Sequence, residues 1–354
     1  MGVMKNFYRG RRIFITGHTG FKGSWLCEIL LNFGAVVGGY SLPPQESTNL
    51  FDLLRLSERI THFTGDVRDP ESLKAAVKSF TPEIVIQMAA QPLVLESYRN
   101  PAYTYSVNVM GTVNILEAVR ECESVKSFLN VTTDKVYLNR EWVYGYRENE
   151  RLCGYDPYSN SKSCSELVTF SYRQSFFGGG NSPAISTARS GNVIGGGDFA
   201  QNRIIPDCVR SALKGEDIVL RNPYSVRPYQ HVLECLNGYL LLAMKQYGGK
   251  ESYEGSYNFG PDEDSCVTTQ NLAEIFCEAW GGSVKTSVQD AQASRPHEAG
   301  LLKLDCAKAK SVLGWHPVWK IEQAVQEVVN WVKVYASHGD IRAYMDDTIT
   351  QRIW

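Results

Sequence analysis

The sequence has no CxxC pair, no long hydrophobic run and no large excess of charge of either sign. Its nine cysteines are an odd number without paired spacing, which argues against a disulfide framework and is typical of a reducing compartment. No stretch approaches the ~18 apolar residues of a membrane span, and the opening MGVMKNFYRGRR lacks the apolar core of a signal peptide. We therefore expect a cytoplasmic protein, and we assign no metal site.

The charges nearly balance, since 36 Lys and Arg against 38 Asp and Glu give a formal net charge of -2. Such a chain has no bulk attraction for nucleic acid or for an anionic membrane, so any anion must be bound locally. A small-molecule partner is expected. The chain has 354 residues, 43% of them hydrophobic, which is enough to bury a large core and predicts about two domains.

The first half alternates short apolar runs with amphipathic stretches, from RIFIT through AVVGGY and EIVIQMAA to FLNVTT. This rhythm is typical of a parallel sheet with crossover helices. We predict an α/β fold, a Rossmann-type doubly wound parallel sheet over residues 1–190. After ISTARSGNVIGGGDFA the composition changes, which predicts a smaller C-terminal α/β substrate-binding domain over 191–354, with a segment that could return to the Rossmann sheet.

A glycine-rich turn, TGHTGFKG, places Gly17, Gly20 and Gly23 between the first strand and the first helix. Such glycines let the backbone approach a pyrophosphate, whose charge is favoured by the free N–H groups of the helix start. The second strand ends without the carboxylate that usually holds the adenosine ribose of NAD, so NADP is not excluded. Asp66, after the third strand, could bind the adenine amino group or could be a plain turn residue.

A second motif, DPYSNSKS, places Tyr158 and Lys162 four residues apart, on one face of a helix. The ammonium can lower the pKa of the phenol and hold the nicotinamide ribose, so that Tyr158 removes a hydroxyl proton. Thr133 adds a hydroxyl at a strand end. Asn108 could orient a water or a helix near the site, or could be an ordinary polar helix residue.

With these motifs placed, the sequence resembles the extended short-chain dehydrogenases/reductases that act on nucleotide sugars. GHTGFKGSWL, TTDKVYLNREWVYGYREN, YDPYSNSK, RSGNVIGGGDF, RIIPD, RNPYSVRPYQHVLE and LGWHP are similar to the CDP-D-glucose 4,6-dehydratases, from residue 17 to about 317. The resemblance implies NAD as cofactor and CDP-glucose as substrate. It also implies oxidation at carbon 4, loss of water across carbons 5 and 6, and return of hydride to carbon 6.

By this resemblance, Asp134 is the acid that protonates the departing hydroxyl, and Thr133 binds the carbon 4 oxygen beside Tyr158. Other nucleotide-sugar dehydratases carry Glu as the base after that Asp, and here the residue is Lys135. A lysine with an ordinary pKa is protonated at neutral pH, so we hypothesise that Lys162 repels it. Adjacent strand residues point to opposite faces, so Asp134 and Lys135 can share a substrate only where the strand curls or ends. The alternative is a surface pair after a strand.

Further residues are expected at the cofactor. His18 could face the nicotinamide or assist proton transfer, or could be a loop histidine satisfied by backbone, and Lys22 could face a phosphate or solvent. The remaining cofactor-site residues are Phe21, Val67, Ala89, Ala90 and Gln91.

The second domain should offer guanidinium groups for a diphosphate. The family pattern places Asn192, Arg221 and Arg295 there, and Arg189 is a further candidate; Arg227 could instead brace its loop. The full set of predicted substrate residues is Asn192, Arg203, Arg221, Arg227, His231 and Arg295. The family commonly has Arg after QPLV, where this chain has Leu95, which affects either substrate choice or assembly.

Three other functions compete: a 4,6-dehydratase for another nucleotide hexose, a nucleotide-sugar 4-epimerase and a non-catalytic dinucleotide sensor. The epimerase needs no acid and base for elimination, and a sensor would lose Tyr158 or Lys162. Family members commonly pair through two long helices, so we expect a homodimer or homotetramer, with pairing through residues 101–121 and 158–177.

Overall fold

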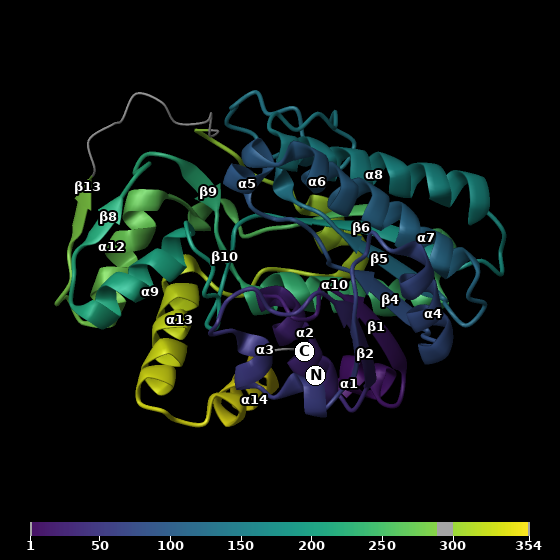
Figure 1. Ribbon diagram of the computed structural model, residues 1–354. Coiled ribbons are helices and arrows are strands. Elements are labelled where there is room, and N and C mark those ends of the chain that lie inside the picture. The colour runs from purple at the N-terminus through teal and green to yellow at the C-terminus, as the bar shows by residue number, and fades with distance from the viewer. Residues whose placement is uncertain (1, 289–299, 353–354) are drawn as a thin grey trace.

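The computed structural model describes residues 2–288 and 300–352, and its centre is a parallel sheet (Figure 1). The strand order is β11-β6-β5-β4-β1-β2-β3, the doubly wound order predicted from the alternating apolar runs. The strands are β1 (Arg12–Thr16), β2 (Val36–Ser41), β3 (Thr61–Thr64), β4 (Ile84–Gln87), β5 (Ser127–Val131), β6 (Ala184–Ser190) and β11 (Ser256–Phe259).

Helices cover both faces of the sheet. One core cluster lies under α1 (Gly2–Tyr8), α2 (Phe21–Asn32) and α10 (Val232–Gly248). The other lies under α4 (Pro70–Phe80), α7 (Gly111–Arg120) and α8 (Pro157–Phe176). The central strands β4 and β5 are buried at every position, as expected of strands covered on both faces.

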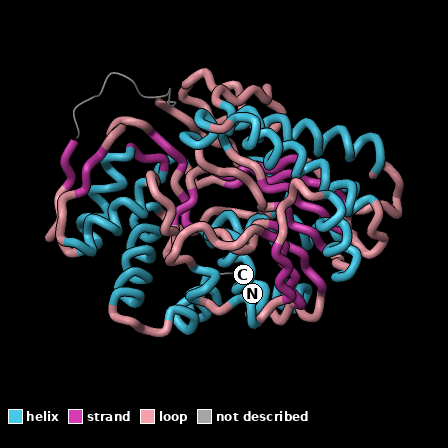
Figure 2. The backbone as a smooth tube through the Cα atoms, in the orientation of Figure 1, coloured by secondary structure: helices cyan, strands magenta, loops and turns pink. Residues whose placement is uncertain are grey.

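Residues after β6 form most of a second region, which lies to the left in Figure 2, with short strand pairs and helices. Its helices are α9 (Ile204–Lys214), α12 (Thr269–Trp280) and α13 (Ile321–Ala336). Its strands are β7 (Val193–Ile194), β8 (Ile218–Leu220), β9 (Val226–Pro228), β10 (Gln230–His231), β12 (Cys266–Thr268) and β13 (Thr286–Val288). β11 and α10, although late in the sequence, belong to the large sheet and its covering helices.

The remaining elements are short, apart from the C-terminal helix. They are α3 (Leu50–Leu53), α5 (Val94–Arg99), α6 (Pro101–Tyr105), a π-helical turn (Ser106–Met110), α11 (Lys250–Tyr253), a second π-helical turn (Ala309–Leu313) and α14 (Ile341–Arg352), with 3-10 turns at Leu56–Glu58, Asp134–Val136 and Glu263–Ser265.

Local sequence explains where the helices around the site begin. Asp69 and Asp156 cap α4 and α8 by accepting from the backbone N–H groups of Ser72 and Ser159, and proline occupies the first position of each helix. Within the described ranges, none of the helices is long and apolar enough to cross a membrane, and His, Cys, Asp and Glu side chains form no metal-binding group.

Candidate active site

A cavity of about 2140 Å³ lies at the carboxyl ends of the parallel strands, where open α/β sheets bind ligands. It is about twice the upper end of the ~300–1,000 Å³ usual for a single-ligand pocket, so it has room for a dinucleotide and a second ligand. Residues from both halves of the chain line it. The predicted residues among them are Gly17, Gly20, Phe21, Lys22, Gly23, Asp66, Val67, Ala89, Ala90, Gln91, Thr133, Lys135, Tyr158, Lys162, Asn192, Arg203, Arg221 and Arg227.

The glycine-rich turn forms one end of the cavity. Gly17 has φ +73°, and a Cβ there would lie 2.7 Å from the backbone nitrogen of Ala89, so a side chain does not fit. A Cβ on Gly23 would lie 2.3 Å from the Gly17 carbonyl oxygen. Gly20 caps α2 without a side-chain hydrogen bond. The helix start therefore presents free N–H groups to the cavity, as a pyrophosphate site requires.

His18 turns away from this cavity. Its buried ring lies against Gly39 of β2, and its Nε2 is 2.7 Å from Nδ1 of His62. Burial, together with the charge of His62, lowers the pKa of His18 to about 3. The imidazole is therefore neutral near pH 7, which does not support the predicted role in proton transfer.

Two other predicted residues shape the loops beside the turn. Asp66 holds Arg68 in an ion pair at 2.6 Å, and this contact lowers the pKa of the carboxyl. Asn108 is buried on the π-helical turn, where its Oδ1 accepts from the Gln91 backbone N–H and its Nδ2 donates to the Gln91 carbonyl and to Ser161. Asn108 thus holds the loop that lines the cavity and does not face the cavity itself.

Tyr158 and Lys162 lie on consecutive turns at the start of α8. Lys162 is 6% exposed, and its ammonium donates to the Val131 carbonyl at 3.2 Å. Burial lowers the pKa of Lys162 to about 8, and the charge of Lys22 acts in the same direction. Burial raises the pKa of Tyr158 to about 12, against the effect of a hydrogen bond with Thr133, so the predicted lowering of the phenol pKa by Lys162 is not found.

The acid and the predicted base follow the end of β5. Asp134 is fully buried, and its Oδ1 accepts from Thr133 Oγ1 at 2.9 Å and from Lys135 Nζ at 3.1 Å. Its Oδ2 has no hydrogen-bond partner within the described residues. The charge of Asp134 acts on Tyr158, so the acid and the phenol are neighbours.

Lys135, after β5, and Lys22, on α2, are the other two lysines among the predicted site residues. Lys135 Nζ also donates to Asn192 Oδ1 at 3.1 Å. Lys22 Nζ donates to Tyr239 Oη at 2.9 Å and to Ser190 Oγ at 3.3 Å, so it points into the site and not to solvent. The cation whose charge lowers the pKa of Lys162 is Lys22; the predicted repulsion between Lys162 and Lys135 stays a hypothesis.

The second region, formed by residues after β6, contributes guanidinium groups to the cavity wall. Arg203 forms an ion pair with Asp198 at 3.1 Å, and its charge reaches Tyr158. Arg221 donates to Asn202 and to Asp207, both at 2.7 Å. Both arginines line the cavity beside an acidic partner.

The other three predicted arginine and histidine residues of the substrate site are not placed like Arg203 and Arg221. Arg227 is 3% exposed and donates to the Val226 carbonyl at 2.9 Å, as a loop brace does, although it also borders the cavity. His231 caps α10 and packs 4.3 Å from the Trp319 ring in the core, which does not support a contact with substrate. Arg295 lies outside the described residues.

Leu95, in place of the family's usual arginine, lines the cavity on α5 with 41% of its surface exposed. Arg99 follows one helical turn later and lines the same cavity. A guanidinium group is therefore present on this helix, displaced by four positions.

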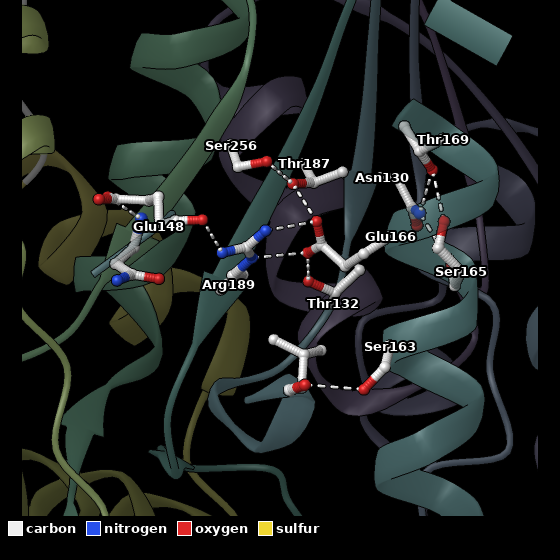
Figure 3. A network of polar contacts seen from close by, with 12 residues as sticks. Asn130, Thr132, Glu148, Ser163, Ser165, Glu166, Thr169, Thr187, Arg189 and Ser256 are labelled. Carbon is white, nitrogen blue, oxygen red and sulfur yellow. Dashed lines mark hydrogen bonds and ion pairs between the residues drawn. The ribbon is translucent and has the colours of Figure 1, made fainter. Parts of the chain in front are cut away.

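Arg189, a candidate for the diphosphate, is buried in an ion pair and does not line the cavity (Figure 3). Its partner is Glu166, which is not among the predicted site residues. The signal for Glu166 was its spacing, since it follows Tyr158 and Lys162 at four-residue intervals on the same helix.

Comparison with known proteins identifies the family. The family model described as GDP-mannose 4,6 dehydratase matches residues 14–328. The CDP-glucose 4,6-dehydratase of Salmonella typhimurium is 46% identical over 96% of this chain and 95% of its own length. The chain belongs to the nucleotide-sugar 4,6-dehydratases.

Solved structures share the fold of this dehydratase. The dTDP-glucose 4,6-dehydratase of Bacillus anthracis, solved in complex with NAD, has a TM-score of 0.76 at 21% identity, covering 94% of this chain and 100% of its own. The UDP-glucose 4-epimerase of Thermotoga maritima, solved with UDP-glucose, has a TM-score of 0.80 at 23% identity, covering 92% and 99%. The predicted α/β fold and the predicted family are both confirmed.

Proposed function

We propose that this enzyme converts CDP-D-glucose to CDP-4-dehydro-6-deoxy-D-glucose with NAD as its cofactor. The observation that carries the proposal is the cluster of Asp134 and Lys135 beside Tyr158, which supplies an acid and a base next to an oxidising site. An epimerase needs only the oxidising part. The 46% identity to the Salmonella CDP-glucose enzyme supports the choice of nucleotide.

The turn at Gly17, Gly20 and Gly23 would hold the NAD pyrophosphate, and Lys162 would hold the nicotinamide ribose. NAD, when bound, accepts the hydride from carbon 4 and returns it to carbon 6. The end of β2 carries hydroxyl groups, with Thr19 Oγ1 2.8 Å from Ser41 Oγ. The cavity-lining residues from Ser41 to Glu46 include one carboxylate and no cation, which favours NAD over NADP.

The chain's own groups then move the protons. Tyr158 takes the proton of the carbon 4 hydroxyl, while Thr133 donates to that oxygen. The resulting ketone acidifies the hydrogen on carbon 5, which Lys135 removes. Asp134 donates a proton to the carbon 6 hydroxyl, which leaves as water. When hydride returns to carbon 6, Lys135 would give its proton back to carbon 5, and the proton on Tyr158 would pass to Asp134. This step needs both groups within reach of adjacent carbons; Lys135 lines the cavity, whereas Asp134 is fully buried in contact with Lys135 and would have to reach the substrate from behind the lining residues.

The diphosphate would lie on the wall formed by the second region. Asn192, Arg203 and Arg221 line it, and guanidinium groups suit phosphate oxygens because they donate in pairs. When phosphate binds, it would compete with Asp198 and Asp207 for the two arginines. Arg227 would keep the adjoining loop in place.

The enzyme would act in the cytoplasm as a homodimer or homotetramer. All nine cysteines are free thiols, which suits a reducing compartment. Large apolar side chains on α8 are exposed, with Leu167 at 53% and Phe170 at 56%, as expected of a helix that pairs with a second subunit.

NMR of the product tests the proposal. Purified enzyme with NAD is given CDP-glucose, and dTDP-, GDP- and UDP-glucose in parallel. A 4-keto-6-deoxy sugar from CDP-glucose is expected. Reaction with another nucleotide alone would overturn the choice of CDP, and a 4-epimer would overturn the roles of Asp134 and Lys135.

A further inference from the structure

One buried ion pair holds both ends of the segment that carries the predicted acid and base. This segment, Thr132–Tyr137, is called the 132–137 segment below. At its start, Thr132 Oγ1 donates to Glu166 Oε1. At its end, Tyr137 Oη accepts from Arg189 at 2.8 Å. Figure 3 shows Arg189 and Glu166 facing each other, with Thr132 pointing to the carboxylate.

The Glu166 carboxylate has its full set of hydrogen bonds. Arg189 donates through Nε and through its terminal nitrogen, both at 2.9 Å, in the two-pronged geometry that fixes both side chains. Thr187 Oγ1 donates to Oε2 at 2.7 Å. Glu166 is 2% exposed, yet these donors hold its pKa below the usual value despite burial, so the pair is ionised.

The position of Glu166 links this pair to the oxidising residues. Glu166 follows Lys162 by one turn on α8, and the same helix sends Ser163 Oγ to the Val136 carbonyl at 2.7 Å. Tyr158 and Lys162 are therefore held by a regular helix. Asp134 and Lys135 lie in a 3-10 turn, and the side chains at the two ends of their segment bond to Glu166 and Arg189, with Tyr137 Oη also donating to Asn258 at 2.7 Å.

We propose that Glu166 and Arg189 are a positioning pair that aligns Asp134 and Lys135 against Tyr158, and thereby sets the rate of elimination relative to oxidation. The inference rests on the proposed dehydration. Neither residue borders the cavity, so the pair acts through the 132–137 segment and not by touching substrate. A catalytic group must be held within roughly 0.5 Å of its working position, which an irregular turn does not achieve without support.

The test separates the two half-reactions in single turnovers, with enzyme and NAD in excess over CDP-glucose. Samples are quenched in acid, reduced with borodeuteride and analysed by mass spectrometry. Unreacted substrate takes up no deuterium. The 4-keto sugar that keeps its carbon 6 hydroxyl takes up deuterium, and the dehydrated product takes up deuterium and lacks that hydroxyl.

Thr132→Val and Tyr137→Phe each release one end of the segment; both side chains also line the cavity and Tyr137→Phe removes the hydrogen bond to Asn258, so Glu166→Gln, which alters no cavity-lining residue, is measured beside them. The matched control is Thr187→Val, because Thr187 donates to the same carboxylate from β6 without belonging to the segment. We expect the first two variants to slow elimination by at least about tenfold, since a displacement of roughly 1 Å can cost about 100-fold. In these two variants the 4-keto sugar that keeps its carbon 6 hydroxyl should accumulate. The control should keep the wild-type ratio of this sugar to the dehydrated product.

Glu166→Gln should show the same accumulation if it folds; if it does not, the two milder variants decide. The positioning role would be overturned if the variants slowed both half-reactions equally or slowed neither. It would also be overturned if Thr187→Val accumulated the 4-keto sugar as much as Thr132→Val and Tyr137→Phe do. The wild-type enzyme tests the proposed function separately. If it dehydrates only another nucleotide hexose, the ratio of 4-keto sugar to dehydrated product is measured with that substrate. If it dehydrates no nucleotide hexose, both the proposed dehydration and the positioning role are wrong.

Discussion

The Lys135 ammonium lies 3.1 Å from the Asp134 carboxylate although the two residues are adjacent in the chain. In a continuing strand their side chains would point to opposite faces. Here β5 ends at Val131, and Asp134–Val136 form a single 3-10 turn that brings both groups to one side. Because the strand ends before Asp134, Asp134 and Lys135 can face one substrate, as the predicted mechanism requires.

This contact leads to a prediction for Lys135. Lys135→Met should lower kcat by about 100-fold or more, the usual range for loss of a general acid or base, because no group replaces the base at carbon 5. The measurement is kcat with CDP-glucose, with the exposed Lys126→Met as control. A Lys135→Glu enzyme should be active with a changed pH dependence, and an unchanged profile would count against Lys135 as base.

Lys162 should lower the free energy of unfolding, although it is needed for catalysis. Burial lowers its pKa from 10.5 to about 8, a shift that corresponds to about 3 kcal/mol. Because the folded-state pKa is the lower one, this cost is complete below pH 8 and is relieved as the pH rises to 10.5. Lys162→Met should therefore raise the free energy of unfolding at pH 7 by about 1–3 kcal/mol, while kcat falls by about 100-fold.

Urea unfolding without NAD measures the first effect, again with Lys126→Met as control. The gain is expected to be smaller than the full shift because the Val131 carbonyl loses its donor. A destabilised Lys162→Met protein would contradict the argument.

The sequence predicted those features of the fold and site that depend on residues close together along the chain. The turn at Gly17, the four-residue spacing of Tyr158 and Lys162, and the alternating runs of the sheet are local patterns, and the cavity gathers their side chains. Arg189 shows where such patterns fail. Its environment is set by Glu166, 23 positions earlier on another element, and the sequence does not show which partner a buried guanidinium will meet.

His231 illustrates the same limit and gives a prediction. It is 1% exposed, and burial lowers its pKa from 6.5 to about 3. Between these values the unfolded chain binds a proton that the folded chain does not, so the free energy of unfolding falls as the pH drops below 6.5. His231→Asn keeps a capping side chain but removes this titration, so the slope should decrease by up to about 1.4 kcal/mol per pH unit.

Urea unfolding at pH 7 and pH 5 measures that slope, and steady-state kinetics with CDP-glucose gives the second readout. KM should stay at the wild-type value because His231 does not border the cavity. A raised KM with an unchanged slope would restore its predicted contact with substrate.

The exposed side of α8 supports a prediction about assembly. Leu167 and Phe170 are three positions apart on this helix and each is more than half exposed, an arrangement that a single subunit gains nothing from. Light scattering after gel filtration should give the wild type a mass of at least two subunits. Phe170→Glu should shift it to one subunit, because a charge buried at the centre of an interface has no partner. Val3→Glu, on the similarly exposed Val3 of α1, is the control and should leave the mass unchanged; a wild-type mass of one subunit would rule out the pairing.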